Sequence, residues 1–246
     1  MTVFIKQLFI QLSMDIRDKG TLLVFYIVPL GFYAVMGAVF SSVNPEVKPV
    51  LSATMAIFSV TMGAVIGLPP SLVKLREAGT LRAYQVTGIP SASVLLSIGI
   101  SAFIHLSVVS VIISVSAPLL FGAEMPHSMG GFISVLAALL LCSVAAGLLI
   151  GATVKSQSTA MLLSQAVFMP SLMLSGIMFP TDLLPAPFGY LSNVFPATHA
   201  MRAFNGLAYG LPTEFNSLMA LAIVLGIGVV VLVAAAWRLG KITRVA

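Results

Sequence analysis

Six long apolar stretches, none of which carries Asp, Glu, Lys or Arg, constrain the fold of this chain more than any other feature. They occupy residues 21–40, 52–68, 93–120, 131–154, 159–179 and 217–237. A helix needs about 20 largely apolar residues to cross the hydrocarbon core of a bilayer. Only 8% of the residues are charged, whereas soluble proteins have about 25%. So few charged residues could not cover a water-exposed surface. The sequence therefore predicts an all-α polytopic membrane protein with six transmembrane helices.

Two of the stretches contain or precede prolines that bear on where a helix ends. The second stretch is the shortest, and the Pro69-Pro70 pair predicts its end. The third stretch is long enough to tilt in the membrane, or to end in an interfacial turn near Pro118.

The basic residues predict which side of the membrane each connection occupies. If the six stretches cross in turn, ten of the twelve Lys and Arg residues fall on one side, and only Lys48 and Arg202 fall on the other. The side richer in basic residues faces the cytoplasm in membrane proteins. We therefore expect a multi-pass protein of the plasma membrane with both termini in the cytoplasm.

Two segments outside the stretches are expected at the membrane surface. Residues 1–20 place apolar side chains at helical spacing among polar ones, which is typical of an interfacial amphipathic helix. A simple anchor and a mechanical role in coupling both fit this helix. Residues 180–212 are apolar but interrupted by five prolines, which predicts short re-entrant helices on the outer side. The connections leave no room for a second soluble domain, so residues 1–246 form a single domain.

The sequence offers no set of residues for catalysis or for binding a cofactor. The stretches contain no carboxylate, so the usual proton or sodium relay of a secondary transporter is missing. Residues 151–156 include a Lys-Ser pair but lack the second glycine and the preceding strand of a P-loop. Cys142 is the single cysteine, and no basic stripe with interleaved aromatics points to nucleic acid. We expect no enzyme activity, cofactor or metal in this chain, so any uphill transport must draw its energy from a partner.

The connection between the second and third stretches is charged and predicts a helical elbow. Residues 72–90 read LVKLREAGTLRAYQVTGIP. A short helix through Lys74, Arg76 and Glu77 can end at Gly79, because glycine tolerates the left-handed conformation of a helix end. Thr80 can then cap a second short helix. The alternative interpretation is an ordinary basic loop that only sets the topology.

Two motifs resemble those of the type-2 ABC exporter permeases. REAGTL at 76–81 is similar to their glutamate-x-glycine-threonine-leucine element, and LSGIMFPTDLLPAPFGYLSNVFPATHAMRAF at 174–204 resembles their span-five signature. The six stretches, the N-terminal helix and the outer insert fit the same family over nearly the whole chain. Lys74 stands where a Glu is common, and Arg82 stands where another acidic residue often follows the leucine. The elbow is therefore more basic than is usual in the family.

The resemblance implies an architecture and a set of partners. In that family the elbow, here residues 73–83, is a coupling helix that docks on an ABC ATPase subunit. Two permeases, either two copies or a copy and a paralogue, pair with two ATPase copies, which bind ATP and Mg. The pathway follows the permease dimer interface, lined largely by spans one, two and five. The residues that the resemblance assigns to ATPase coupling are Lys74, Arg76, Glu77, Gly79, Thr80 and Arg82.

Further polar and flexible residues are candidates for the pathway and its exit. The pathway candidates are Pro29, His105, Ser164, Gln165, Met169 and Met173. A kinked helix can line a cavity, and flexible methionines suit a hydrophobic substrate. For the polar residues, the alternative interpretation is hydrogen bonding between helices. For the methionines, it is a surface that faces lipid. The gate candidates on the outer side are Asp182, His199 and Arg202, for which the alternative is an anchor at the headgroups.

Glycine pairs at a spacing of four, Gly63 with Gly67 and Gly147 with Gly151, are typical of close helix packing. Gly63 and Gly67 are also candidates for a dimer contact.

The sequence as a whole predicts the permease subunit of an ATP-driven ABC exporter. Its cargo is an amphipathic or hydrophobic compound, such as a drug, antibiotic, lipid or small peptide, taken from the cytoplasm or the inner leaflet. The alternatives are a permease for polysaccharide or lipid-linked glycan export, a channel that does not use ATP, and a structural membrane subunit.

Overall fold

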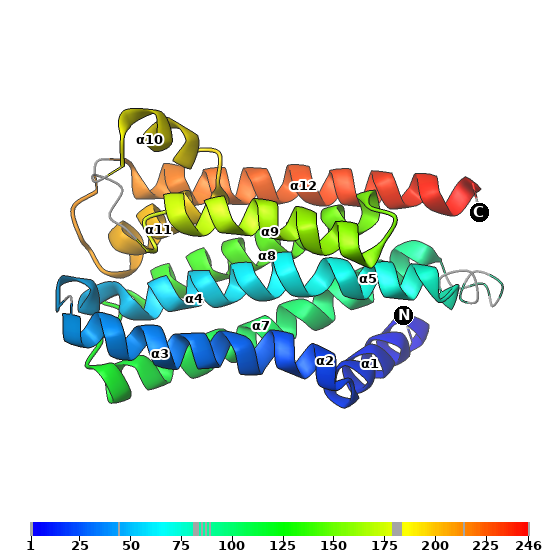
Figure 1. Ribbon diagram of the computed structural model, residues 1–246, viewed down its shortest axis with the longest axis horizontal. Coiled ribbons are helices and arrows are strands. Elements are labelled where there is room, and N and C mark those ends of the chain that lie inside the picture. The colour runs from blue at the N-terminus through cyan, green and yellow to red at the C-terminus, as the bar shows by residue number, and fades with distance from the viewer. Residues whose placement is uncertain are drawn as a thin grey trace.

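The computed structural model describes residues 2–43, 45–80, 84, 86, 88, 90–178, 184–213 and 215–245. Every regular element among these residues is helical. The long helices run side by side along one axis, as Figure 1 shows, and both chain ends lie at the same end of the bundle. We call this the terminal end, and we call the opposite end, where α10 and α11 lie, the far end.

The helices of the described residues follow in chain order. They are α1 (Thr2–Arg17), α2 (Lys19–Leu22), η1 (Leu23–Ile27), α3 (Val28–Val43), η2 (Pro45–Val50), α4 (Leu51–Met62), η3 (Gly63–Gly67), α5 (Leu68–Glu77), α7 (Ser91–Phe121), α8 (Met129–Thr153), α9 (Gln157–Leu174), α10 (Ala186–Ser192), α11 (Pro196–Ala203), η5 (Phe204–Ala208) and α12 (Ser217–Val245). The elements η1, η3 and η5 are π-helical turns, and η2 is a 3-10 helix.

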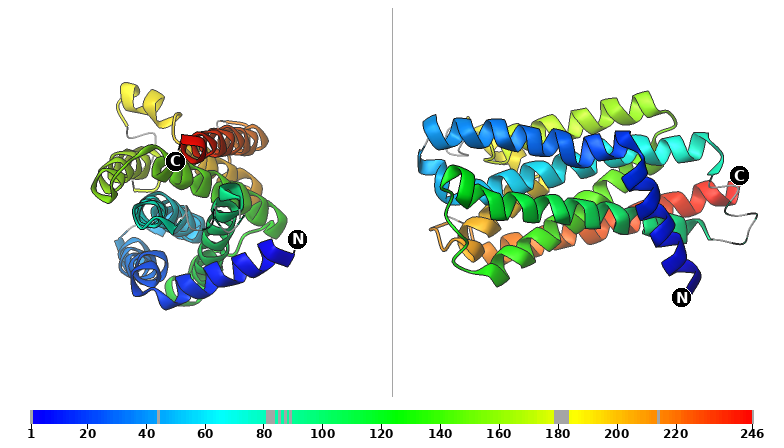
Figure 2. Two further views of the ribbon diagram at one scale, coloured as in Figure 1. Left: turned by 90° about the vertical axis from the view of Figure 1, so that its right-hand side faces the viewer. Right: turned by 90° about the horizontal axis from the view of Figure 1, so that it is seen from below.

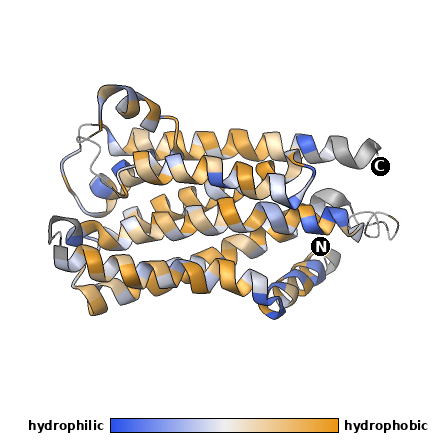
Figure 3. Cartoon of the chain, viewed as in Figure 1, coloured by the Kyte–Doolittle hydropathy of each residue, from blue (hydrophilic) through white to orange (hydrophobic). Residues whose placement is uncertain are grey.

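Five helices in the described part of the chain are long and apolar enough to cross a membrane. They are Lys19–Ser42, Lys48–Glu77, Ser93–Phe121, Met129–Thr153 and Ser217–Arg238. Apolar residues make up most of their length, and hydrophilic residues gather toward the ends of the bundle (Figure 3). The all-α membrane architecture predicted from the sequence is therefore confirmed.

The predicted fifth span corresponds to α9, which is shorter than the sequence suggested. It covers 18 residues, Gln157–Leu174, instead of the predicted 159–179. The chain turns at Gly176, whose φ of +81° is the left-handed conformation that glycine tolerates. α9 begins with three polar residues, 157–159, and is less apolar than the five span helices. It is therefore not among the five, and the count of six stays a prediction.

The helix from α4 through η3 to α5 forms the centre of the bundle. Of its apolar segment, 89% is buried inside the protein, against 22% for the first and the last of the five span helices. It packs against α3, α7, α8 and α9. The views down and across the bundle in Figure 2 show the other helices arranged around it.

The sequence predicted that this central helix ends at Pro69-Pro70, and that prediction is wrong. The helix continues without a break to Glu77. In an α-helix the proline ring meets the carbonyl four residues earlier. The π-helical turn η3 lies directly before the two prolines and widens the backbone there. The prolines consequently fall in the first turn of α5 instead of stopping the helix.

The outer insert contains the expected short helical pieces, α10 and α11 with η5. α11 packs against α4, α8, α9 and α12, and it buries Ala197, Thr198, His199 and Ala200. α10 contacts α9 and leaves Tyr190 exposed. Whether these pieces re-enter the membrane stays a prediction.

Candidate functional site

The C-terminal turn of α5 holds the end of α8. Arg76 donates from Nη1 to the backbone carbonyl oxygens of Gly151 and Val154, each at 2.9 Å. These carbonyls belong to the end of α8, where the last backbone acceptors lack partners within the helix. A cationic side chain at a helix C-terminus satisfies such acceptors and complements the helix dipole. Arg76, predicted to dock on a partner, is therefore half-buried and bonded within the chain.

The neighbouring Glu77 joins α5 to α9. Its Oε2 accepts a hydrogen bond of 2.9 Å from Nε2 of Gln157, the first residue of α9. Ser156 caps the same helix start by accepting from the backbone N–H of Thr159. Two consecutive residues of α5 thus connect it to the end of α8 and to the start of α9. We call this arrangement the α5–α8–α9 junction.

The other elbow candidates are partly described. Lys74 is exposed to solvent on α5. Gly79 has a φ of +70° and donates its N–H to the carbonyl oxygen of Arg76, which confirms that the helix ends there. Arg82 and the rest of 81–83 lie outside the described residues, so the structure does not test the second short helix that Thr80 was expected to cap.

The pathway candidates on α9 divide between two faces. Gln165, Met169 and Met173 follow each other at a spacing of four, and all three are exposed, with Met169 at 46% and Met173 at 50%. Residues four apart lie on one side of a helix. Ser164 is fully buried, and its hydroxyl has no hydrogen-bond partner among the described residues. The structure therefore offers Gln165, Met169 and Met173, but not Ser164, as an accessible surface.

Three phenylalanines connect α9 to α3 through α4, a feature that the sequence analysis missed. Phe32 and Phe58 stack with ring centroids 3.9 Å apart, and Phe58 meets Phe168 edge-on at 5.8 Å. Such aromatic pairs add to the energy of simple apolar burial. Nothing in the spacing of the three residues signals the contact, because each lies on a different helix.

A comparison with family models identifies the chain. The sequence model of the ABC-2 type transporter matches residues 6–209, most of the 246-residue chain. The chain belongs to the ABC-2 type transporter family. A comparison with curated proteins gave no match.

Membership of this family fixes the general role of the molecule. An ABC-2 permease is a multi-pass membrane component of a transporter and is not itself the catalytic subunit. Permeases of this family generally pair with an ABC ATPase. Among the described residues of this ABC-2 permease, no three His, Cys, Asp or Glu side chains come together as a metal site.

The remaining pathway candidates lie away from the exposed face of α9. Pro29 is buried in the first turn of α3, directly after the π-helical turn η1. His105 lies inside the bundle on α7, where Nδ1 shares a hydrogen bond of 2.7 Å with the hydroxyl of Tyr26 from η1. The Phe25 ring stacks on the imidazole with centroids 6.0 Å apart. These contacts favour the interhelical role over a wall of an open pathway.

Two of the gate candidates hold the far end together. His199 donates from Nε2 to the backbone carbonyl of Asn193, and Arg202 donates from Nη1 to Oδ1 of the same residue at 2.7 Å. Both side chains also lie beside the Phe215 ring, with the Arg202 guanidinium 5.6 Å from its centroid. Asp182 lies outside the described residues. The described contacts fasten α11 to the end of α10, as the anchoring interpretation expects.

The glycine pairs serve packing within the chain. A Cβ on Gly63 would lie 2.3 Å from Leu106 Cδ2, and one on Gly67 would lie 2.7 Å from Val24 Cγ1. On α8, a Cβ on Gly147 would lie 2.2 Å from the Ala64 carbonyl oxygen. Both pairs therefore let neighbouring helices of the same chain approach closely, and Gly63 and Gly67 are turned toward η1 and α7.

Proposed function

We propose that this ABC-2 permease is the transmembrane subunit of an ATP-driven exporter. Its cargo is an amphipathic or hydrophobic compound, such as a drug, antibiotic, lipid or small peptide, moved out of the cytoplasm or the inner leaflet. Two permease chains, identical or paralogous, pair with two ATPase subunits, and the ATPase subunits bind ATP and Mg. The family match and its usual pairing with an ABC ATPase support this proposal.

The proposed topology has six spans in the plasma membrane, with α9 as the fifth and the terminal end in the cytoplasm. The bias of basic residues supports this orientation. The end of α5 and both chain ends lie together at the terminal end (Figure 1), as an even number of crossings requires. The segment with α10 and α11 then forms the re-entrant helices on the outer side.

The α5–α8–α9 junction is the observation that carries the proposal. Residues 73–83 are the proposed docking element for the ATPase, and they begin inside the last turns of α5. A movement imposed on this element reaches α8 through Arg76 and α9 through Glu77. α9 in turn presents Gln165, Met169 and Met173 on its accessible face. Polarizable, flexible methionines adapt to cargo of variable shape.

Reconstitution with the cognate ATPase tests the proposal. The permease and the ATPase are co-purified into vesicles, and ATP hydrolysis and cargo movement are measured together. We expect hydrolysis to be stimulated by the cargo and movement to require ATP. Flux of cargo through the permease alone, with no ATPase present, would contradict the mechanism.

Charge reversals locate the coupling within the complex. Lys74→Glu and Glu77→Arg are expected to lower cargo-stimulated hydrolysis without reducing the amount of permease in the membrane. Lys48→Glu is the matched control, because it makes the same charge change in η2, at the far end of the bundle. Equal stimulation in all three variants would remove residues 74–77 from the coupling role.

A further inference from the structure

A stripe of polar residues on α1 faces a matching stripe on α7. Gln7, Gln11 and Asp15 repeat at a spacing of four along α1, which places them on one side of that helix. Ser93, Ser97, Ser101 and His105 repeat at the same spacing along α7. Other apolar residues of α1, such as Phe9 at 67%, are exposed. The polar stripe of α1 thus faces the bundle, while part of its apolar surface faces outward.

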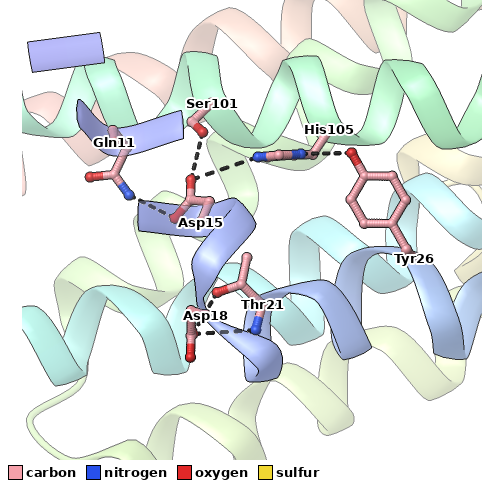
Figure 4. A network of polar contacts seen from close by, with 7 residues as sticks. All are labelled: Gln11, Asp15, Asp18, Thr21, Tyr26, Ser101 and His105. Carbon is pink, nitrogen blue, oxygen red and sulfur yellow. Dashed lines mark hydrogen bonds and ion pairs between the residues drawn. The ribbon is translucent and has the colours of Figure 1, made fainter. Parts of the chain in front are cut away.

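Hydrogen bonds join the two stripes. Ser93 donates to Oε1 of Gln7 at 2.9 Å, and Ser101 donates to Oδ2 of Asp15 at 2.5 Å. Gln11 donates to the other carboxylate oxygen, Oδ1, at 2.9 Å (Figure 4). Both oxygens of Asp15 are therefore occupied as acceptors, which fixes the carboxylate against α7.

His105 completes this arrangement with one ring nitrogen left unbonded. The imidazole is 4% exposed, and Nδ1 is engaged with Tyr26. Nε2 points at Oδ2 of Asp15 across 4.0 Å and has no hydrogen-bond partner among the described residues. A gap of this size is too long for a hydrogen bond and short enough for a strong charge interaction. A buried nitrogen aimed at a half-buried carboxylate is a site for one proton.

We propose that Asp15 and His105 together form a proton-binding site that fastens α1 to α7. With the proton bound, an imidazolium faces a carboxylate, and Nδ1–H donates to the Tyr26 oxygen. With the proton released, the imidazole is neutral, the Tyr26 hydroxyl donates to Nδ1, and Nε2–H faces Asp15 as a weaker dipole. The pair carries no net charge in the first state and one negative charge in the second. Proton uptake therefore strengthens the attraction between the helices.

Burial at Asp15 disfavours the state in which the pair carries one negative charge. Burial raises the pKa of Asp15, and the negative charge of Asp18 on the next turn raises it further, against the hydrogen bonds from Ser101 and Gln11 and the charge of His105. Asp18 itself is bonded to Thr21 and therefore does not compete for the imidazole. Two ionisable groups this close titrate as a pair.

Among the residues that the structure describes, the other elements around α7 add no charge to the site. α3, α4, η3 and α8 contain no Asp, Glu, Lys, Arg or His. Tyr33 of α3 is bonded to Ser116, and Cys142 of α8 faces Gly228 of α12. Arg238, the charged residue of α12 whose side chain the structure describes, lies near Arg76. Tyr26 and Asp15 are thus the ionisable groups in contact with the imidazole.

The titration of the site is measured directly on the purified permease. The chain has three histidines, so a ¹⁵N-histidine sample gives few resonances, and His105→Gln identifies those of the site. We expect them to titrate, and we expect Asp15→Asn to lower the midpoint, because the variant lacks the carboxylate charge that stabilises the imidazolium. Asp18→Asn is the control and should move the midpoint less than Asp15→Asn does. No titration of the His105 resonances, or the same midpoint in Asp15→Asn, would overturn the proposal.

A second measurement follows the helix contact and does not need Asp15→Asn to fold. Cysteines replace Gln7 and Ser93 in a Cys142→Ala background, and the rate of cross-linking is compared at pH 6 and pH 8. The same cysteine pair in His105→Gln corrects for the reactivity of the thiols themselves. We expect the corrected rate to be about threefold higher at pH 6. If cross-linking had the same pH dependence with His105 and with His105→Gln, protonation of the site would not control the contact between α1 and α7, and the proposal would be wrong.

Neither measurement needs an ATPase or a cargo. Their failure would therefore leave the proposed export function standing, and failure of export would leave the proton site standing. A change of transport rate with cytoplasmic pH rests on the proposed function and follows only if both hold.

Discussion

The contacts that α8 and α7 make with their neighbours differ in kind. α8 meets η3 and α5 through Gly147 and Gly151, which bring backbone against backbone. α7 meets α1 through hydrogen-bonding side chains and a pair of ionisable groups. The first contact depends on shape alone, so it is the same at any pH. The second depends on protonation, so the central bundle can stay rigid while the attachment of α1 varies.

Filling the glycine contact should have the largest effect. Gly147→Ala places a methyl group 2.2 Å from the carbonyl oxygen of Ala64, where only backbone can yield. Overpacking of this kind costs about 1–3 kcal/mol of stability. The melting temperature of the purified permease measures it. Gly226→Ala on α12 is the control, since a Cβ there meets nothing within 4 Å. Equal melting of both variants would contradict the close approach of α8 to η3.

Replacing the Arg76 guanidinium by a shorter, neutral side chain should be the next largest change. Arg76→Gln leaves the carbonyls of Gly151 and Val154 without their donor, and a buried acceptor without a partner costs about 1–3 kcal/mol. Arg76→Lys should recover part of the loss by keeping the charge at the helix end. Glu77→Gln, measured in the same thermal unfolding experiment, should change little because that residue is exposed. A variant Arg76→Gln as stable as the parent would show that the α8 end does not need this cap.

The capping residue beside the polar contact should have a moderate effect. Asp18 caps α2 by accepting from the N–H and hydroxyl of Thr21, and loss of such a cap costs about 1 kcal/mol. These bonds lower the pKa of Asp18. The stability they contribute is therefore present above the unfolded pKa and is lost as pH falls through the folded pKa. We expect Asp18→Ala to destabilise at neutral pH and not in acid, with Asp18→Ser retaining most of the stability. If Asp18→Ala lost the same free energy of unfolding at both pH values, the capping contribution would not depend on the ionisation of Asp18.

The smallest expected effect is that of Asp15→Asn on overall stability. Burial raises the pKa of Asp15, so the folded chain holds the proton more tightly than the unfolded chain. The stability contributed by this carboxyl is present below its unfolded pKa and is lost as pH rises through the folded pKa. Asn mimics the protonated form, so the variant should gain relative to the parent as pH rises. Unfolding in denaturant over a series of pH values measures this slope, and a parallel slope in both proteins would contradict it.

Hydropathy alone predicted most of the fold. The third and fourth stretches, 93–120 and 131–154, lie within two residues of α7 and α8 at each end, because long apolar runs leave few other options. Gly79 was recognised as a helix end from its backbone freedom. Pro69-Pro70 was interpreted as a helix end because proline normally interrupts a regular α-helix. Nothing in the sequence of residues 63–67 indicates the π-helical turn that accommodates the two prolines.

The sequence predicted the candidate site only where the pattern lies within a single helix, and it could not predict contacts between residues far apart in the chain. The polar repeats on α1 and α7 are visible in the sequence at a spacing of four, but nothing in either helix says that they face each other. Arg76 was assigned to docking because its motif resembles the coupling element of the type-2 ABC permeases, and that resemblance says nothing of its contacts within the chain. Its acceptors, Gly151 and Val154, are about 75 positions away along the chain and are backbone atoms, which leave no trace in residue types.

The π-helical turn η3 determines how α5 is rotated about its own axis, and therefore which way the side chains of α5 point. If residues 63–67 relaxed into a regular α-helix with the same sequence, α5 would rotate by about 100° and shift by about 1.5 Å along its axis. Arg76 would then leave the carbonyls of α8, and Glu77 would leave Gln157. The hydrogen bonds of Arg76 and Glu77 at the terminal end thus depend on the backbone conformation of η3, several residues earlier in the same helix. A change in that one turn would break the contacts of α5 with both α8 and α9.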